Sequence, residues 1–473
     1  MKGEGMKNLY FLGIGGIGMS ALARYYHSQG CVVAGYDRTP SPLTKQLENE
    51  GMTIHYEDNP SLLPAQIDQV IYTPAVPQEL NEFAEIKRRG IPMMKRAEAL
   101  GAISKEHFTI AVAGTHGKTT TTAMVAHILK ECGVDMTAFI GGIANNFGSN
   151  LHIGKTDKAI LVVEADEFDR SFLHLDPNIS IINSIDADHL DIYGDRAHLI
   201  ESFNEFANLT QQCVIAKEGL EVRRSVSLFG MPQRRCITPC GSYDKAPFAA
   251  TQKDLRFGFD EDNDLRAEVI STADGFTDFT IHTDDHDTLV HLPLAGQHNV
   301  LNATAAFAST LQLGLAPEAI AKALSSFKGV KRRFDIRTRT NNYIYIDDYA
   351  HHPEEIKSCL SAIKASFPSK RVTVVFQPHL FTRTRDFMEG FASSLAMADS
   401  LILLDIYPAR EKPIEGITSQ ALLDKVQMND KRLCAKKDLL STIEELKPEL
   451  LVTMGAGDID RFVEPLENMI RQW

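Results

Sequence analysis

The feature that most constrains this chain is a glycine-rich loop between an apolar segment and an amphipathic one. The loop, Ala-Gly-Thr-His-Gly-Lys-Thr-Thr at 113–120, follows the apolar run 108–113, and apolar residues recur at helical spacing over 121–131. Its two glycines let backbone N–H groups approach phosphate oxygens, and a helix N-terminus adds partial positive charge. The order of strand, loop, lysine, threonine and helix predicts a phosphate-binding loop, although only two residues separate the glycines.

Two side chains of this loop have specific chemistry. Lys118 is suited to neutralising β- and γ-phosphates, and the Thr119 hydroxyl to holding Mg²⁺. Glu164 ends another apolar run, 159–164, so its carboxylate is a second candidate Mg²⁺ ligand. His189 follows a further strand; by its chemistry alone it suits a transition metal or a hydrogen bond.

A second glycine loop, Gly13-Ile-Gly-Gly-Ile-Gly18, lies after the first apolar run of the chain. The next apolar run ends at Asp37, about 19 residues past Gly18, where a dinucleotide-binding unit has its ribose-binding acid. The pattern indicates a ligand with a diphosphate, and taken alone it suggests NAD. The plainer alternative is a tight turn in a sheet without a ligand.

Composition limits the partners and the compartment. The chain has 473 residues, 44% of them hydrophobic, and a net charge of −13, which disfavours nucleic acid and anionic membranes. Its seven cysteines are scattered, as in reduced cytosolic proteins, and no apolar run reaches the length of a membrane span. We therefore expect a cytoplasmic protein with no nucleic-acid partner and no membrane insertion.

Strands and helices alternate along three blocks, which predicts an α/β fold with mostly parallel sheets. The expected domains are 1–106, 107–329 and 330–473. Residues 225–295 have few helical patterns and many turn residues, so we expect a β-rich insertion or flank there.

Polar residues follow consecutive strands of the third block, where parallel strands gather ligands. They include Asp348, Tyr349 and His351 after one strand, and His379 and Arg383 after the next. Nearer the block boundary, Asn299 could cap a helix or reach a nucleotide base, and Arg333 could be solvated or reach a phosphate.

Together these motifs resemble the Mur ligase family over nearly the whole chain. The general family marks are residues 114–119, 164–167, 188–189 and 298–302, Arg333 and Asp348. The marks of the alanine-adding members are residues 13–20, 347–353, 376–379, 382–385 and 407–413. No lysine lies between His189 and Lys217, so we do not expect the carbamylated lysine of the later-acting members.

The resemblance implies three domains: a Rossmann-like N-terminal domain for a UDP sugar, a central P-loop ATPase-like domain, and a Rossmann-like C-terminal domain for the amino acid. It implies ATP-dependent joining of L-alanine to the lactyl carboxylate of UDP-N-acetylmuramate through an acyl phosphate, in peptidoglycan precursor synthesis. ATP and Mg²⁺ are the implied cofactors, and we expect a monomer or a weak homodimer.

The resemblance also implies site residues. Those expected to act in catalysis are Lys118, His351 and Arg383. Those expected to bind ATP are Gly114, Thr115, His116, Gly117, Lys118, Thr119, Thr120, Asn299, Arg333 and Asp348. Those expected to bind the UDP sugar are Gly15, Gly16, Ile17, Asp37 and Thr73, and those expected to bind the amino acid are Tyr349, His351, His379 and Arg383. Those expected to hold the metal are Thr119, Glu164 and His189.

Three alternatives remain at this point. One is a related ligase that attaches a recycled peptide to the same sugar nucleotide. The second is a nicotinamide-dependent oxidoreductase, which would leave the loop around Lys118 unexplained. The third is a nucleotide-binding regulator without turnover.

Overall fold

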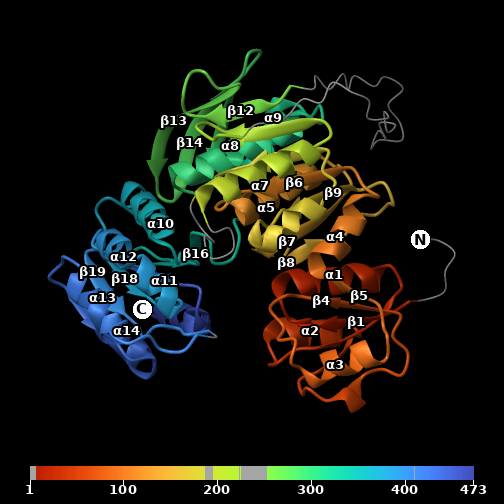
Figure 1. The fold of residues 1–473 in the computed structure, drawn as a ribbon. Coiled ribbons are helices and arrows are strands. Elements are labelled where there is room, and N and C mark those ends of the chain that lie inside the picture. The colour runs from red at the N-terminus through yellow and green to blue at the C-terminus, as the bar shows by residue number, and fades with distance from the viewer. Residues whose placement is uncertain (1–6, 187–194, 223, 225–252, 410) are drawn as a thin grey trace. The chain divides into compact units, whose positions relative to one another are not determined.

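The computed structural model describes residues 7–186, 195–222, 224, 253–409 and 411–473. Within this part of the chain, sheets of five, ten and six strands follow one another in sequence, each with helices between its strands (Figure 1). This arrangement confirms the predicted α/β class.

The N-terminal sheet has the order β3-β2-β1-β4-β5, and all of its neighbouring strands are parallel. Its elements are β1 (Asn8–Leu12), α1 (Ile17–Ser28), β2 (Val32–Tyr36), α2 (Pro42–Asn49), β3 (Thr53–His55), η1 (Pro60–Leu62), β4 (Gln69–Tyr72), α3 (Asn81–Arg88), β5 (Met93–Lys95) and α4 (Arg96–Ser104). The strand order reverses at β1. A doubly wound sheet binds ligands at such a point, and the loop that begins at Gly13 starts there.

Alternation along β1 divides its side chains between the two faces of this sheet. Leu9 and Phe11 pack with α1, α2 and α4, whereas Tyr10 and Leu12 pack with Phe83 and the rest of α3. Helices therefore cover both faces, as in a Rossmann-like domain.

The second sheet contains the loop around Lys118. Its first-unit part has the order β12-β11-β10-β6-β9-β7-β8, with β6 near the middle and β8 antiparallel at the edge. The elements are β6 (Thr109–Ala113), α5 (Lys118–Glu131), β7 (Met136–Ala144), β8 (Ser149–His152), β9 (Ile160–Glu164), η2 (Phe168–His174), β10 (Ile179–Ile182), α7 (Arg196–Leu209), β11 (Cys213–Lys217) and β12 (Leu255–Gly258). They are followed by β13 (Leu265–Ala273), β14 (Phe276–His282), β15 (Asp287–Leu292), α8 (Gln297–Leu311) and α9 (Pro317–Leu324). Strands β12 to β15 confirm the expected β-rich segment in its described part.

One hydrophobic core joins the first sheet to the second. The cluster that contains Leu22 of α1 also contains Phe139 of β7 and Leu151 of β8. The Tyr25 and Phe139 rings lie 5.5 Å apart, and Arg24 Nη1 donates to Asn150 Oδ1 at 2.8 Å. Helix α1 therefore packs against both its own sheet and the edge of the next.

The C-terminal sheet has the order β16-β17-β21-β18-β19-β20, parallel except for β16. Its elements are β16 (Asp335–Arg339), β17 (Ile344–Asp348), α10 (Pro353–Ser366), β18 (Val372–Phe376), α11 (Phe381–Asp386), α12 (Met388–Leu395), β19 (Ser400–Leu403), α13 (Ser419–Lys425), β20 (Lys431–Leu433), η3 (Lys436–Asp438), α14 (Leu439–Leu446), β21 (Leu450–Met454), η4 (Asp458–Phe462) and α15 (Val463–Ile470). Leu360 of α10 packs on one face, and Leu439 of α14 and Leu466 of α15 pack on the other.

By compactness the chain divides into two units. The first is Met1–Arg266, His282–His286 and Leu301–Ala323; the second is Ala267–Ile281, Asp287–Val300 and Leu324–Trp473. Within the described residues, no helix is long and apolar enough to span a bilayer.

Candidate functional site

The loop between β6 and α5 has the backbone that its glycines predict. Gly114 has φ +133° and Gly117 has φ +81°, values that side chains with a Cβ rarely adopt. A Cβ on Gly114 would lie 2.9 Å from Ser184 N, and one on Gly117 would lie 3.0 Å from Asn183 Nδ2. The end of β10 therefore packs directly under the loop, and both glycines are required by conformation and by space.

Lys118, the first residue of α5, points back at its own loop. Its Nζ donates to Gly114 O at 2.6 Å and to the Glu167 carboxylate at 2.7 and 2.9 Å. Burial lowers the pKa of Lys118, but the carboxylates of Glu167, Glu164 and Asp166 outweigh this effect and hold the pKa above its usual value. The side chain is therefore a protonated cation beside the loop.

The two described residues predicted to hold the metal lie in contact. Thr119 Oγ1 donates to Glu164 Oε2 at 2.9 Å, and the same oxygen accepts from Gly141 N at 2.9 Å. A hydroxyl and a carboxylate beside a phosphate-binding loop form an oxygen donor set that fits Mg²⁺. His189 lies outside the described residues, and among the residues described no group of three or more His, Cys, Asp or Glu side chains could hold a metal.

The segment that follows β10 also supplies polar contacts that sequence reasoning missed. Ser184 Oγ accepts from His116 N at 2.8 Å and lies 2.9 Å from Thr115 Oγ1. His116 Nε2 lies 3.5 Å from Asp186 Oδ2. The signal that could have identified these partners is the polar pair Asn183-Ser184 at the end of an apolar strand.

The first glycine loop is crowded by the residues that follow β2 and β4. Gly15 N donates to Asp37 Oδ2 at 2.8 Å, so this carboxylate contacts the loop itself. A Cβ on Gly13 would lie 2.9 Å from the side chains of both Thr73 and Val76. Four of the residues predicted to bind the UDP sugar, Gly15, Gly16, Asp37 and Thr73, therefore belong to one sheet edge, and Ile17 begins α1 beside them.

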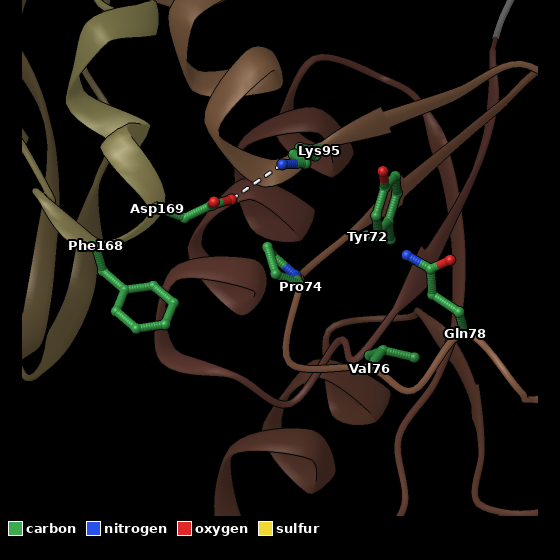
Figure 2. Close-up of a pocket in the computed structure, with 7 residues that line it drawn as sticks. All are labelled: Tyr72, Pro74, Val76, Gln78, Lys95, Phe168 and Asp169. Atoms are coloured by element: carbon green, nitrogen blue, oxygen red, sulfur yellow. Dashed lines mark hydrogen bonds and ion pairs between the residues drawn. The ribbon is translucent and has the colours of Figure 1, made fainter. Parts of the chain in front are cut away.

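A pocket of about 360 Å³ opens at the ends of β4 and β5. Figure 2 shows Tyr72, Pro74, Val76 and Gln78 on one side and Phe168 and Asp169 on the other, with Lys95 paired to Asp169 at 3.0 Å. The Pro-Ala-Val-Pro motif at 74–77 suits a loop that lines a ligand cleft, and Pro74 and Val76 do line this pocket.

The acidic segment after β9 contacts both parts of the first unit. Asp166 accepts from Arg96 Nη2 at 2.9 Å, and Asp169 pairs with Lys95. Asp169 and Arg170 have φ near +54° and +52°, an uncommon conformation for residues other than glycine. In this segment Glu167 thus contacts Lys118, whereas Asp166 and Asp169 contact the end of β5 and the start of α4.

The remaining residues predicted to bind ATP belong to the second unit. Asn299 is buried, and its Nδ2 donates to Ala295 O at 2.7 Å. Helix α8 begins at Gln297, two residues earlier, so Asn299 does not occupy the N-cap position. Asp348 accepts from Phe334 N at 2.6 Å and Ala350 N at 2.8 Å. Burial raises the pKa of Asp348 to about 6, against the opposing charge of Arg333.

The residues predicted to bind the amino acid form a row of rings at the ends of β17 and β18. The Tyr349 and His351 rings lie 5.1 Å apart, and the His351 and His379 rings 6.3 Å apart. The His379 ring stacks on Tyr407 at 5.7 Å. The structure therefore brings together three of the four side chains predicted for this pocket.

Arg383, the fourth, acts on this row through its charge. Burial lowers the pKa of His379 to about 4, and the neighbouring His351 and Arg383 lower it further. Burial also lowers the pKa of His351, and Arg383 adds to that effect. Both imidazoles are neutral at pH 7, which makes Arg383 the cation among these four side chains.

The sheets and the loop around Lys118 define an α/β protein with a glycine loop of the kind that binds phosphate. Comparison with known families extends this class. Residues 8–108 match the Mur ligase family, catalytic domain; residues 112–224 and 242–310 match the Mur ligase middle domain; and residues 332–458 match the Mur ligase, glutamate ligase domain.

Individual proteins agree with these matches. The UDP-N-acetylmuramate–L-alanine ligase of Christiangramia forsetii is 45% identical over 475 residues, covering 98% of each chain. The solved UDP-N-acetylmuramate-alanine ligase of Thermotoga maritima is 29% identical, with a TM-score of 0.79, over 98% of this chain and 99% of that one. A murein peptide ligase from Psychrobacter arcticus shares the fold, with a TM-score of 0.70 and 24% identity over 98% of each chain. This chain belongs to the Mur ligase family and has its three-domain α/β fold.

Proposed function

We propose that this protein is an ATP-dependent ligase that joins L-alanine to UDP-N-acetylmuramate in peptidoglycan precursor synthesis. The observation that carries the proposal is the 45% identity to a ligase of that name over nearly the full length of both chains. The Lys118 loop, whose glycines and lysine suit phosphate binding, supports it. The murein peptide ligase is less similar, at 24% identity, which favours alanine over a recycled peptide.

The proposed reaction has two steps. The lactyl carboxylate attacks the γ-phosphorus of ATP, a bond forms from carboxylate oxygen to phosphorus, and ADP leaves. The alanine amine then attacks the acyl carbon, the C–O bond to phosphate breaks, and inorganic phosphate and a proton are released. Phosphorylation is needed because oxide is a poor leaving group, and the approach of two anions requires nearby positive charge.

Lys118 is placed to supply that charge. Its protonated Nζ lies on the phosphate-binding loop and is held by Glu167, so ATP would replace one anionic partner by another. The other residues that we propose for ATP in the loop are Gly114, Thr115, His116, Gly117, Thr119 and Thr120. We propose the same ligand for Asn299, Arg333 and Asp348 of the second unit.

Mg²⁺ is the proposed cofactor, with Thr119 and Glu164 as ligands and His189 as a third. The contact between Thr119 Oγ1 and Glu164 Oε2 supports the first two. When bound, the metal would offset phosphate charge.

The first glycine loop is proposed to take the diphosphate of the UDP sugar at Gly15, Gly16 and Ile17. Asp37 and Thr73 flank it on the two neighbouring strands. The pocket at Tyr72, Lys95 and Phe168 continues the same sheet edge toward the acidic segment, so we propose that it receives the sugar end of this substrate.

Tyr349, His351, His379 and Arg383 are proposed to bind L-alanine. Because the two imidazoles are neutral, the Arg383 guanidinium is the group proposed to bind the alanine carboxylate, which it can hold with two parallel hydrogen bonds. His351 and Arg383 are the C-terminal residues proposed to act in catalysis together with Lys118.

The domain boundaries near residues 106 and 329, a cytoplasmic location, and a monomeric or weakly dimeric state are part of the same proposal. The boundaries are supported by family matches that begin at residues 8, 112 and 332.

An ADP-release assay with ATP, UDP-N-acetylmuramate and a panel of amino acids tests the function. We expect release with L-alanine and less with glycine and L-serine, because a pocket for one methyl group discriminates by only about 1–3 kcal/mol. Release with a peptide but not with L-alanine would instead identify a peptide ligase, and no release with any acceptor would favour a binding protein.

A further inference from the structure

Glu355 connects two parts of the second unit to which the proposed function gives different substrates. Its Oε2 accepts from His351 N at 3.0 Å and lies 3.3 Å from His351 Nδ1. Its Oε1 lies 3.8 Å from Arg333 Nη1, and its side chain is 17% exposed. A single, largely buried carboxylate therefore contacts a residue proposed for ATP and a residue proposed for alanine.

The sequence has two adjacent glutamates at this turn, and only one is directed inward. Helix α10 begins at Pro353, so Glu354 and Glu355 both lie in its first turn, where a carboxylate interacts favourably with the helix dipole. Glu354 is 65% exposed and lies 3.9 Å from Lys357. A helix-capping role explains the bond to His351 N but does not explain the approach to Arg333.

Charge around His351 adds a second observation. Burial lowers the pKa of His351, Arg383 and Arg333 lower it further, and Glu355 opposes them. The His379 ring lies 6.3 Å from the His351 ring. Glu355 likewise opposes burial and Arg333 at His298, whose pKa falls to about 4. The carboxylate of Glu355 thus offsets Arg333 and Arg383 at His351, and Arg333 at His298.

We propose that Glu355 is a positioning residue of the ligase reaction. It holds the Arg333 guanidinium and the His351 main chain and ring in one arrangement, so that the group serving ATP and the group serving the amino acid are placed together. The proposal rests on the proposed function for the roles of Arg333 and His351, but the contacts of Glu355 do not depend on it.

Glu355→Gln separates capping from positioning. The amide oxygen of Gln still accepts from His351 N, whereas the charge opposite Arg333 is lost. Glu354→Gln is the matched control, because it removes a charge from the same helix turn without a contact to either residue. Both variants are made in the full chain, and kcat and KM are measured separately for ATP and L-alanine.

We expect Glu355→Gln to lower kcat/KM by about tenfold or more for both substrates, because the half-buried Arg333 guanidinium loses the carboxylate 3.8 Å away. We expect its thermal midpoint to match that of Glu354→Gln. In an NMR titration the His351 pKa should fall in Glu355→Gln, stay unchanged in Glu354→Gln, and recover in Glu355→Asp.

Two results would overturn the proposal: kcat/KM within twofold of wild type for both substrates, or an activity loss matched by a lower thermal midpoint with an unshifted His351. Absence of ADP release by the wild type would reject the proposed function and the reaction role of Glu355. The His351 titration would still report whether Glu355 holds that ring, so the two failures are distinguishable.

Discussion

The Nζ atom of Lys118 lies 2.7 and 2.9 Å from the two carboxylate oxygens of Glu167, a side chain that is only 1% exposed. Two opposite charges are therefore buried together at the phosphate-binding loop. Removing one partner of such a pair leaves the other charge uncompensated, at a cost of about 3–5 kcal/mol. This relationship changes how the role of the lysine has to be tested.

We predict that Lys118→Ala abolishes turnover and also lowers stability, because the buried Glu167 carboxylate loses the ammonium group that contacts both of its oxygens. The double variant Lys118→Ala with Glu167→Gln should recover most of the stability and none of the activity. ADP release and thermal denaturation of the full chain provide the two readouts. Near-native turnover in the stable double variant would reject the assignment of Lys118.

We predict that Glu164→Ala raises the Mg²⁺ concentration for half-maximal activity by at least about tenfold. Mutating even a residue that only hydrogen-bonds to a metal ligand typically lowers metal affinity by that much. The reason is that Glu164 is the carboxylate in contact with Thr119. A magnesium titration of ADP release measures it, with Glu131→Gln, an exposed residue at the end of α5, as control. Equal half-saturation in both variants would make Glu164 a structural residue.

We predict that Arg383→Ala raises the KM for L-alanine about tenfold to a hundredfold, since a hydrogen bond to a charged group contributes about 1.5–3 kcal/mol. Arg385→Ala is the matched control on the same helix, because Arg385 is half-exposed and pairs with its neighbour Asp386. If the two variants had the same KM for alanine, the carboxylate anchor would lie elsewhere.

We predict that burial of Asp348 makes stability depend on pH. Its folded pKa of about 6 lies above its ordinary value, so the folded state binds this proton more tightly. That stabilisation is complete below about pH 4 and is lost as pH rises through about 6. A tenfold difference in proton affinity between the folded and unfolded states is equivalent to roughly 1.4 kcal/mol of unfolding free energy. The thermal midpoint of Asp348→Asn relative to wild type should therefore rise between pH 4 and pH 7. The exposed Asp405→Asn should show no such trend, and a flat difference for Asp348→Asn would contradict the prediction.

We predict that Gly16→Ala folds normally but loses affinity for UDP-N-acetylmuramate by at least about tenfold, equivalent to 1.4 kcal/mol. Gly16 has φ −64°, and the nearest atom to an added Cβ is 3.5 Å away, so only a bound ligand should sense the methyl group. Calorimetry on both full-length proteins, with NAD as the second ligand, measures it. Tight NAD binding without uptake of the UDP sugar would overturn the proposal for this loop.

The long buried strands and the loops after them could be predicted from the sequence. The runs that became β6, β9, β18 and β21 are apolar over about five residues, and central strands of parallel sheets are buried on both faces. The ring row of Tyr349, His351 and His379 could be predicted from the order of the strands, because the carboxyl ends of parallel strands meet at one edge of a sheet.

Other elements left no comparable signal. β3 and β5 are three residues long and partly exposed, and β7 contains Gly141 and Gly142, which favour a turn. The partners of charged side chains could not be predicted from the sequence either. Nothing in the spacing distinguishes Glu355 from Glu354, or shows that Glu167 rather than Glu164 pairs with Lys118, because such choices are made by packing.

Helix α1, which packs on its own sheet and on β7 and β8, has a consequence for exchanging parts between relatives. A chimaera joined near residue 106 would take α1 from one parent and β7 and β8 from the other. The Arg24–Asn150 bond and the Tyr25–Phe139 ring contact would then have to form between side chains from two different parents. Substitutions in α1 are thus expected to accompany substitutions in β7 and β8 during divergence. The first glycine loop, helix α1 and strands β7 and β8 are therefore expected to be exchanged, or to diverge, as one unit.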